Sequence, residues 1–360
     1  MVVSIFDEEK LSLFLKWEWE QWFKKKQIYQ SIFDKQIIDF SEMTNLSKTL
    51  REKLTQHFSI VDLSCETTLE DEQTTKFAFK THDGQLIESV LMYHWSKHHE
   101  GKLNRITLCL SSQVWCPVGC AFCVTGKLWV RRNLTMEEML GQVIYANHYI
   151  KQRFAKKADG TYRKVRNIVF MWMGEPLLNY SHLQELFPYL LDQNKLSLSR
   201  RHITISTVGI IPWIQRLIDD KIDVKLAVSL HAPNQILREE LIPYAKMYPL
   251  DNLLEVLDRY IEATDNRIFY EYIMIKEKTD TLELAHELWK LLQGKLVHLN
   301  LIPYNENPVV DFEETSRNQI FRFKKVVEWY GVTVTIRDSM GREVNSACGQ
   351  LGHDRLTAST

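Results

Sequence analysis

The chain has 360 residues, of which 45% are hydrophobic and 25% charged, and its formal net charge is −1. These values are typical of a soluble globular protein with one large domain or two modest ones. The near-neutral charge excludes a global nucleic-acid signature, so any RNA binding must come from local patches. Neither a secretion signal nor an apolar run of membrane-spanning length is recognisable, so we expect a cytoplasmic protein that does not bind membranes.

Residues 1–72 have apolar residues at helical spacing, as in Leu11–Trp17 and Gln27–Phe33, and predict a small helical accessory domain. Two alternating runs then flank Asp83-Gly84, which predicts a β-hairpin linker over residues 73–100. Glu88 lies in its second strand, where the local pattern favours a solvent-facing position.

From Arg105 onward, strand and helix patterns alternate. This alternation predicts βα units around a parallel sheet, and six or so units favour a partial (β/α)6 barrel over residues 101–305, with a C-terminal extension over 306–360. No Gly-x-Gly-x-x-Gly follows a strand, which argues against a Rossmann sheet. The predicted strands are Arg105–Leu110, Arg166–Met171, His202–Ser206, Asp223–Ser229, Arg267–Ile275, Leu296–Ile302 and Val332–Arg337. The predicted helices are Met136–Ile150, Ser181–Asp192, Ile211–Asp219, Leu250–Ala263, Thr281–Leu292 and Phe321–Tyr330.

Polar motifs follow five of these strands. Any one of them alone would be an ordinary turn or helix cap, but five on the carboxyl rim of a barrel predict a site. They are Cys109 with the loop after it, Gly174-Glu175-Pro176, Ser206-Thr-Val-Gly209, Ser229-Leu230-His231 and Pro303-Tyr-Asn305.

The loop after the first strand contains Cys116, Cys120 and Cys123 at C-x3-C-x2-C spacing. Three thiolates on one tight loop can hold three irons of a [4Fe–4S] cluster and leave the fourth iron open to a small molecule. A zinc site is the weaker alternative, because the usual pair of Cys-x2-Cys elements is missing. Cys348 lies between Ala347 and Gly349, where small neighbours favour an accessible thiol, although a lone cysteine is more often buried and inert.

Residues 151–166 hold seven basic side chains and one acidic side chain, Asp159. A charge run of this kind is more often a solvated loop than a binding site. Further basic residues follow the cysteine loop and precede the third strand, which makes a phosphate-binding surface near the rim a credible alternative.

These motifs, taken together and in order, closely resemble the RlmN/Cfr family of radical S-adenosylmethionine (SAM) adenine methyltransferases. The resemblance covers nearly the whole chain, including the N-terminal helical domain. It is carried by the cysteine loop and by Ser111–Val114, Arg132–Leu134, Gly174–Asn179, Ser229–Pro233, Leu301–Asn305 and Ala347–Leu351.

The resemblance implies one [4Fe–4S] cluster held by Cys116, Cys120 and Cys123, and two SAM molecules per turnover. One SAM would methylate Cys348, and the other would yield a radical that activates this methyl group for addition to adenine. Glu88 would remove the ring proton, which overturns its local interpretation, and Cys109 would release the product by forming a disulfide with Cys348. The residues implied in SAM binding are Gly174, Glu175, Ser206, Ser229, Leu230, His231 and Asn305.

The implied substrates are adenine 2503 of 23S ribosomal RNA, in the peptidyl transferase centre, and tRNA adenosine 37. RlmN-type members methylate carbon C2. An electron donor such as flavodoxin or ferredoxin is also implied. Two alternatives stay open: a Cfr-type enzyme that methylates C8 of the ribosomal adenosine, and a non-catalytic Fe–S protein that binds RNA.

Three tryptophans depart from the family's pattern. Trp115, Trp129 and Trp172 stand where the family typically has glycine, and an indole there would crowd the cluster or SAM. We hypothesise that their codons are UGA, which the source organism reads as glycine. The counts of 13 glycines and 10 tryptophans agree with this hypothesis. If the tryptophans are genuine, cluster assembly and SAM fit are compromised.

Overall fold

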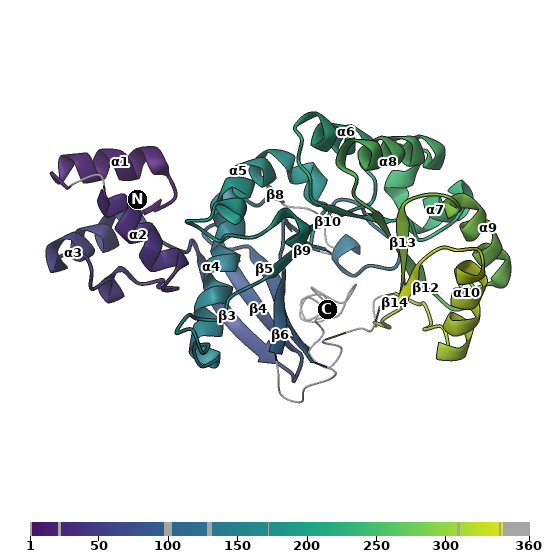
Figure 1. The fold of residues 1–360 in the computed structure, drawn as a ribbon, viewed down its shortest axis with the longest axis horizontal. Coiled ribbons are helices and arrows are strands. Elements are labelled where there is room, and N and C mark those ends of the chain that lie inside the picture. Colours follow the sequence, from purple (N-terminus) through teal and green to yellow (C-terminus); the bar gives the residue numbers. More distant parts are fainter. Residues whose placement is uncertain are drawn as a thin grey trace.

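The structure is a computed structural model that describes residues 2–20, 23–96, 103–127, 132–171, 173–307, 310–337 and 340. Figure 1 shows a small helical unit beside a large unit in which helices cover a curved sheet. Within the described residues, no helix is both long and apolar enough to cross a bilayer.

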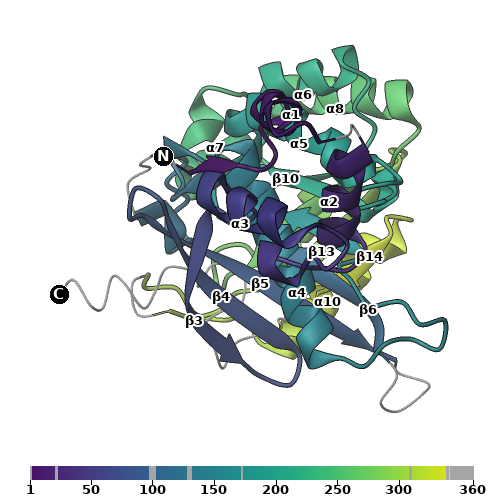
Figure 2. The same ribbon diagram turned by 90° about the vertical axis from the view of Figure 1, so that its left-hand side faces the viewer.

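The N-terminal unit consists of three short helices and a two-stranded parallel sheet (Figure 2). Its elements are β1 (Val3–Ser4), α1 (Glu8–Trp17), α2 (Phe23–Phe33), η1 (Phe40–Glu42), α3 (Lys48–His57) and β2 (Phe58–Ser59). The helical pattern ends at His57, so the prediction of helix up to residue 72 is wrong for Leu63–Glu70, which forms strand β3. Of this strand only Leu63 is buried, and an edge strand with one buried residue leaves no period-2 signal.

One ten-stranded sheet runs through the large unit in the order β14-β13-β12-β11-β10-β9-β6-β5-β4-β3. Strands β3 to β6 pair antiparallel, and β6 and β9 to β14 pair parallel, which confirms the predicted partial barrel. The predicted hairpin is present, and its strands belong to this sheet. The bounds are β4 (Thr74–Thr81), β5 (Leu86–Trp95), β6 (Leu103–Cys109), β9 (Asn167–Phe170), β10 (Ile203–Thr207), β11 (Lys225–Ser229), β12 (Ile268–Met274), β13 (Val297–Pro303) and β14 (Val334–Ile336).

Helices cover the outer face of the parallel strands, and all six predicted helices are present. They are α4 (Met136–Arg153), α5 (Tyr180–Leu191), α6 (Ile211–Asp219), α8 (Leu250–Thr264), α9 (Leu282–Leu292) and α10 (Arg317–Trp329). The sequence analysis missed α7 (Gln235–Leu241). The remaining short elements are β7 (Gln113–Val114), β8 (Arg132–Asn133), η2 (Thr125–Lys127), η3 (Pro176–Asn179), η4 (Arg200–His202) and η5 (Pro243–Lys246).

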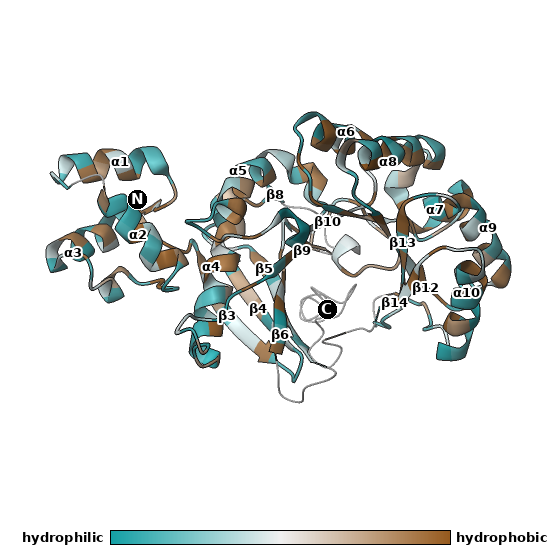
Figure 3. Ribbon diagram, in the orientation of Figure 1, coloured by the Kyte–Doolittle hydropathy of each residue, from teal (hydrophilic) through white to brown (hydrophobic). Residues whose placement is uncertain are grey.

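Most buried apolar side chains form one continuous core, and a smaller cluster lies around the cysteine loop. Figure 3 shows hydrophobic residues concentrated along α4, α5 and β13. The N-terminal unit packs onto the barrel through Phe6, whose ring meets that of Tyr189 edge-on at 5.6 Å. Gln36 also donates a hydrogen bond from Nε2 to the carbonyl of Arg163 (2.8 Å). The two units are therefore joined by an interface with both apolar and polar contacts.

Candidate active site

A pocket opens at the carboxyl ends of the parallel strands. Its walls come from the cysteine loop and from the ends of β9, β10 and β11. It brings together most of the predicted cluster and SAM residues: Cys116, Cys120, Cys123, Gly174, Glu175, Ser206, Ser229 and His231. Motifs that follow several of the strands therefore line one common pocket.

The three loop cysteines are free thiols, and Cys120 and Cys123 are buried. Burial raises the pKa of Cys116 and Cys120 well above the usual thiol range, and the neighbouring cysteines raise it further. Without a bound cation these thiols are neutral, and binding of metal would release their protons. The three cysteines line one pocket and keep the C-x3-C-x2-C spacing of an iron–sulfur cluster loop, although no group of three His, Cys, Asp or Glu side chains within the described residues is arranged to hold a single metal ion.

Glycine at position 174 is required by space as well as by backbone conformation. Its φ is +99°, and a Cβ atom there would lie 2.8 Å from Cβ of Gln113. The next residue, Glu175, is buried and accepts hydrogen bonds from the amides of Val208 (2.8 Å) and Leu177 (3.0 Å). Burial raises the pKa of Glu175 to about 7 in spite of these bonds. A cationic ligand group in the pocket would favour its charged form.

His231 places an imidazole N–H in the pocket. Its Nδ1 accepts a hydrogen bond from the amide of Ile273 (3.1 Å), which leaves the proton of the neutral ring on Nε2. Within the described residues Nε2 is buried and has no partner, as expected for a donor that meets a ligand. Burial lowers the pKa of His231 to about 3, and Arg238 lowers it further. The ring of Phe122 packs edge-on against it at 4.7 Å.

Arg238, on α7, is a residue that the sequence analysis missed. Its side chain is fully buried and donates to the carbonyls of Val208 (2.6 Å) and Ser229 (3.4 Å). Its Nε and Nη1 have no partner within the described residues. Burial lowers the pKa of Arg238 to about 10, whereas the nearby Cys120 raises it. Arg238 thus places a positive charge behind the cysteine loop, where it would stabilise thiolates.

Two predicted SAM residues lie outside the pocket lining. Leu230 is fully buried, and its amide donates to the carbonyl of Glu271 (3.1 Å). Asn305 is buried just beyond the end of β13. Both lie at the carboxyl ends of barrel strands, as predicted.

Glu88 and Cys109 lie on the neighbouring strands β5 and β6. Val90 is the register partner of Cys109, so Glu88 lies two residues away along the same face. Glu88 is only 3% exposed, and therefore the local prediction of a solvent-facing position is wrong. Its carboxylate lies 3.7 Å from Nζ of the equally buried Lys76. The Cys109 thiol contacts the carbonyl of Met171 (3.0 Å).

Two family models match the chain: the radical SAM superfamily over residues 110–288 and the ribosomal RNA large subunit methyltransferase N-terminal domain over residues 4–60. The probable dual-specificity RNA methyltransferase RlmN of Dictyoglomus turgidum is 39% identical over 91% of this chain and 90% of its own length. The RlmN of Bacillus licheniformis is 38% identical over 96% of this chain and 92% of its own. This chain belongs to the RlmN family.

The fold agrees with that assignment. The crystal structure of a radical SAM methyltransferase from Sphaerobacter thermophilus superposes with a TM-score of 0.87 and 36% identity, and the match covers 97% of each chain. Radical SAM proteins carry a [4Fe–4S] cluster and SAM. The thiols, the buried carboxyl of Glu175 and the unpartnered N–H of His231 fit these two groups.

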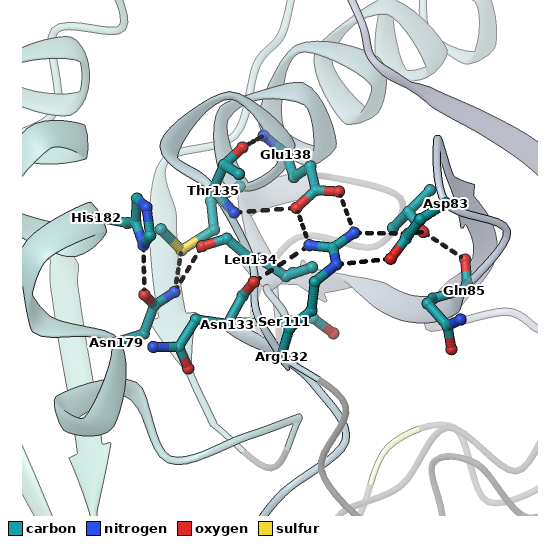
Figure 4. Close-up of polar contacts among 12 residues, drawn as sticks. Asp83, Gln85, Ser111, Arg132, Asn133, Leu134, Thr135, Glu138, Asn179 and His182 are labelled. Atoms are coloured by element: carbon teal, nitrogen blue, oxygen red, sulfur yellow. Dashed lines mark hydrogen bonds and ion pairs between the residues drawn. The ribbon is translucent and has the colours of Figure 1, made fainter.

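In this RlmN family member, Arg132 fastens the end of the cysteine loop to the hairpin of Glu88 (Figure 4). Its guanidinium bonds both carboxylate oxygens of Asp83 (2.7 and 2.8 Å) and of Glu138 (2.7 and 2.8 Å). Glu138 also forms a capping box with Thr135 at the start of α4. Arg132 holds the pKa of Asp83 well below its usual range. We call Arg132, Asp83 and Glu138 the clamp, and these contacts fix the end of the cysteine loop to the sheet and to α4.

Trp115 has a left-handed backbone, with φ of +67°, and is 8% exposed. That conformation costs a bulky residue about 1 kcal/mol or more, whereas glycine adopts it freely. The backbone at residue 115 therefore agrees with the glycine hypothesis. Trp129, Trp172 and Cys348 lie outside the described residues, so their positions and the predicted pairing of Cys348 with Cys109 stay predictions.

Proposed function

We propose that this protein methylates carbon C2 of adenosine in RNA, at adenine 2503 of 23S ribosomal RNA and at tRNA adenosine 37. Membership in the RlmN family supports the reaction class, and the relatives' names support RNA as the substrate. The pocket is the observation that carries the proposal, because it joins three cluster-spaced thiols to a buried carboxyl group and an imidazole donor.

Within the pocket, Cys116, Cys120 and Cys123 would hold the cluster. Gly174, Glu175, Ser206, Ser229, Leu230, His231 and Asn305 would bind SAM. When bound, the two groups supply the one-electron chemistry that methylation of an unactivated aromatic carbon requires. Neutral His231 can donate a hydrogen bond at all physiological pH values, and Glu175 offers an acceptor for a cationic amine.

The protein's own residues would carry the remaining steps. The thiolate of Cys348 would take the methyl group of SAM by nucleophilic displacement, which breaks the sulfonium–methyl bond and leaves S-adenosylhomocysteine. After this carbon has bonded to the adenine ring and the adduct has given up one electron, Glu88 accepts the ring proton; Lys76 lies beside this carboxyl group. The thiolate of Cys109 then attacks the sulfur of Cys348 and breaks its bond to the added carbon, which takes up a proton to become the methyl group. The Cys109–Cys348 disulfide left behind must be reduced by an external thiol or electron donor before the next turnover. Glu88 and Cys109 share one face of adjacent strands, which supports this division of roles.

The test is anaerobic reconstitution with iron, sulfide, SAM and a reductant such as flavodoxin or ferredoxin, with ribosomal RNA fragments and tRNA transcripts as substrates. Mass spectrometry of the digested RNA should show 2-methyladenosine. Modification at C8 alone would identify a Cfr-type enzyme. The absence of both 5′-deoxyadenosine and methylated RNA would favour a non-catalytic Fe–S protein that binds RNA.

A further inference from the structure

A second pocket lies at the opposite, amino-terminal end of the barrel strands, between the start of β6 and the loop after α4. Five basic residues and no acidic residue line this pocket. We call the five residues the basic floor: Arg105, Lys157, Arg163, Lys164 and Arg166. For this loop the sequence analysis weighed a solvated run against a phosphate-binding surface near the carboxyl rim; the loop lies at the opposite end of the strands, so the expected position near the rim is wrong.

Most floor cations form no close ion pair, although Lys157 lies near enough to Asp159 to lower the pKa of that carboxyl group. In the described stretches 103–127 and 132–171, Arg132 and Arg153 form ion pairs, but Arg105, Lys157, Arg163 and Arg166 do not. Lys164 has the nearby Asp34 as a counter-charge. Solvated surface lysines and arginines ordinarily point away from one another. Here they converge on a cavity, which is the arrangement of an anion site.

Further cations extend this field across the next strands. Burial lowers the pKa of Lys225, at the start of β11, and the nearby Arg105 and Arg201 lower it further. Burial likewise lowers the pKa of His202, and the surrounding cations Arg201 and Arg166 add to the effect. The side chains therefore lie close enough to repel one another. A polyanion would relieve that repulsion.

The basic floor is linked to Cys109 through strand β6, and it also lies next to the N-terminal unit. Arg105 and Cys109 lie four residues apart on β6 and face the same side, so about 13 Å of strand separates them. On the other side, Gln36 of the N-terminal unit bonds the Arg163 carbonyl. An extended strand of nucleic acid with one base near Cys109 can therefore reach the floor within a few nucleotides.

We infer that the basic floor binds phosphate groups of the RNA strand next to the target adenosine. This inference rests on the proposed function, because RNA is the polyanion that such an enzyme must hold. Phosphate contacts of this kind position an RNA without reading its sequence. The floor would thus serve both ribosomal RNA and tRNA.

The test compares two triple variants that lose the same charge. The floor variant is Lys157→Gln/Arg163→Gln/Arg166→Gln, and its matched control is Lys290→Gln/Arg322→Gln/Lys325→Gln on α9 and α10. Fluorescence anisotropy with a labelled tRNA transcript gives Kd over a range of salt concentrations. We expect the floor variant to bind about ten- to fiftyfold more weakly near 0.15 M salt, with a salt slope smaller by about 2, and the control to change less than about twofold.

Equal behaviour of the two triple variants would overturn the inference. A third variant, Lys157→Arg/Arg163→Lys/Arg166→Lys, keeps the charge and should retain the salt slope even if the glutamine variant folds poorly. In the methylation assay the floor variant should show a raised KM with kcat retained. If wild-type protein yields no methylated RNA, the proposed function fails, while the binding comparison still decides whether the floor holds RNA.

A different observation carries a second inference, which concerns Trp19. Helix α1 ends in a Schellman motif: the amide of Trp19 bonds the carbonyl of Lys16 (3.2 Å), and that of Glu20 bonds the carbonyl of Leu15 (2.9 Å). Trp19 is its left-handed residue, with φ of +57°, a position that glycine usually fills. Its side chain is 94% exposed, so no burial offsets the backbone cost.

We propose that residue 19, like residue 115, is glycine in the protein that the source organism makes, and that both codons are UGA. Reading the codons and measuring the mass of the peptides from native protein test this directly. UGG at both positions would overturn it.

A matched pair of variants tests the conformational argument. Trp17 lies two residues earlier, inside the helix, and is 83% exposed. Trp19→Gly should raise Tm by roughly 1–3 °C, whereas Trp17→Gly should lower it, because glycine is favoured only where φ is positive. A fall in Tm for both variants would contradict the argument.

Discussion

The two pockets lie at opposite ends of the same strands and differ in almost every physical property. The carboxyl-end pocket buries its ionisable groups, which shifts the pKa of Cys116, Glu175 and His231 toward their neutral forms. In the basic floor, Arg105, Lys157 and Arg166 are exposed and form no close ion pair within the described residues, whereas Lys164 is partly buried near Asp34. Strand β6 lines the basic floor through Arg105, and its other end, at Cys109, leads into the cysteine loop that lines the carboxyl-end pocket. Buried ionisable groups with shifted pKa values are typical of catalytic sites, and the carboxyl-end pocket has them. Exposed cations bind polyanions reversibly, and the basic floor has these.

The largest difference between the carboxyl-end pocket and the basic floor should appear when one cluster ligand is removed. Cys120→Ala should abolish iron loading and methylation, because three thiolates are required on the loop. RNA affinity and its salt slope should stay within about twofold of wild type, because the floor is intact. Iron analysis and anisotropy measure the two properties on one sample. Cys65→Ala, on β3, is the control and should keep its iron. Loss of RNA binding in Cys120→Ala would show that the ends are not independent.

The next test removes the thiol at the carboxyl end of β6. Cys109→Ala should stop turnover after covalent attachment, because no second thiol resolves the adduct on Cys348. Denaturing gels should then show a protein–RNA crosslink, whereas wild type should release its RNA. Free, fully methylated RNA from the variant would remove Cys109 from the mechanism.

A smaller effect should appear in acid stability. The folded-state pKa of His231, about 3, lies below the ordinary histidine value, so the neutral ring stabilises the fold at neutral pH and that stabilisation is lost as pH falls from about 6.5 toward 3. Between pH 7 and 5 it should account for about 2 kcal/mol of the free energy of unfolding. Urea unfolding of His231→Gln should show a correspondingly flatter pH dependence. His286→Gln, on α9, should leave the dependence unchanged, and an equal flattening there would contradict the assignment.

The smallest predicted effect concerns the clamp. Arg132→Gln should lower the free energy of unfolding by about 1 kcal/mol, since the Asp83 side of the clamp is largely exposed. The stabilisation from Asp83 is present above its ordinary pKa and is lost as pH falls through the lowered folded value. The variant should therefore lose less stability than wild type between pH 5 and 3, as measured by urea unfolding. A steeper loss would argue against the clamp.

The sequence predicted the parallel strands well because each is a short, nearly continuous apolar run, and it placed the motifs at the correct strand ends. It missed β3 because an edge strand buries a single residue, Leu63, and it missed α7 because seven residues are too few for a clear period. Arg238 lies on the helix that the sequence did not reveal, and no motif singles it out. Only the packing of α7 against the cysteine loop shows that its charge is internal. Likewise, Trp19 gives no signal until φ is known.

The antiparallel strands β3 to β6 limit where this chain can tolerate insertions and deletions. Glu88 and Cys109 reach the same face only because β5 is paired with β6 residue by residue, with Val90 opposite Cys109. The turn at Asp83-Gly84 is exposed and can accept insertions. A deletion of one residue between Glu88 and Val90, by contrast, would turn Glu88 to the opposite face of the sheet while leaving the fold's pairing largely intact. Length changes in this family should therefore collect in the turn and be absent from the few residues after Glu88.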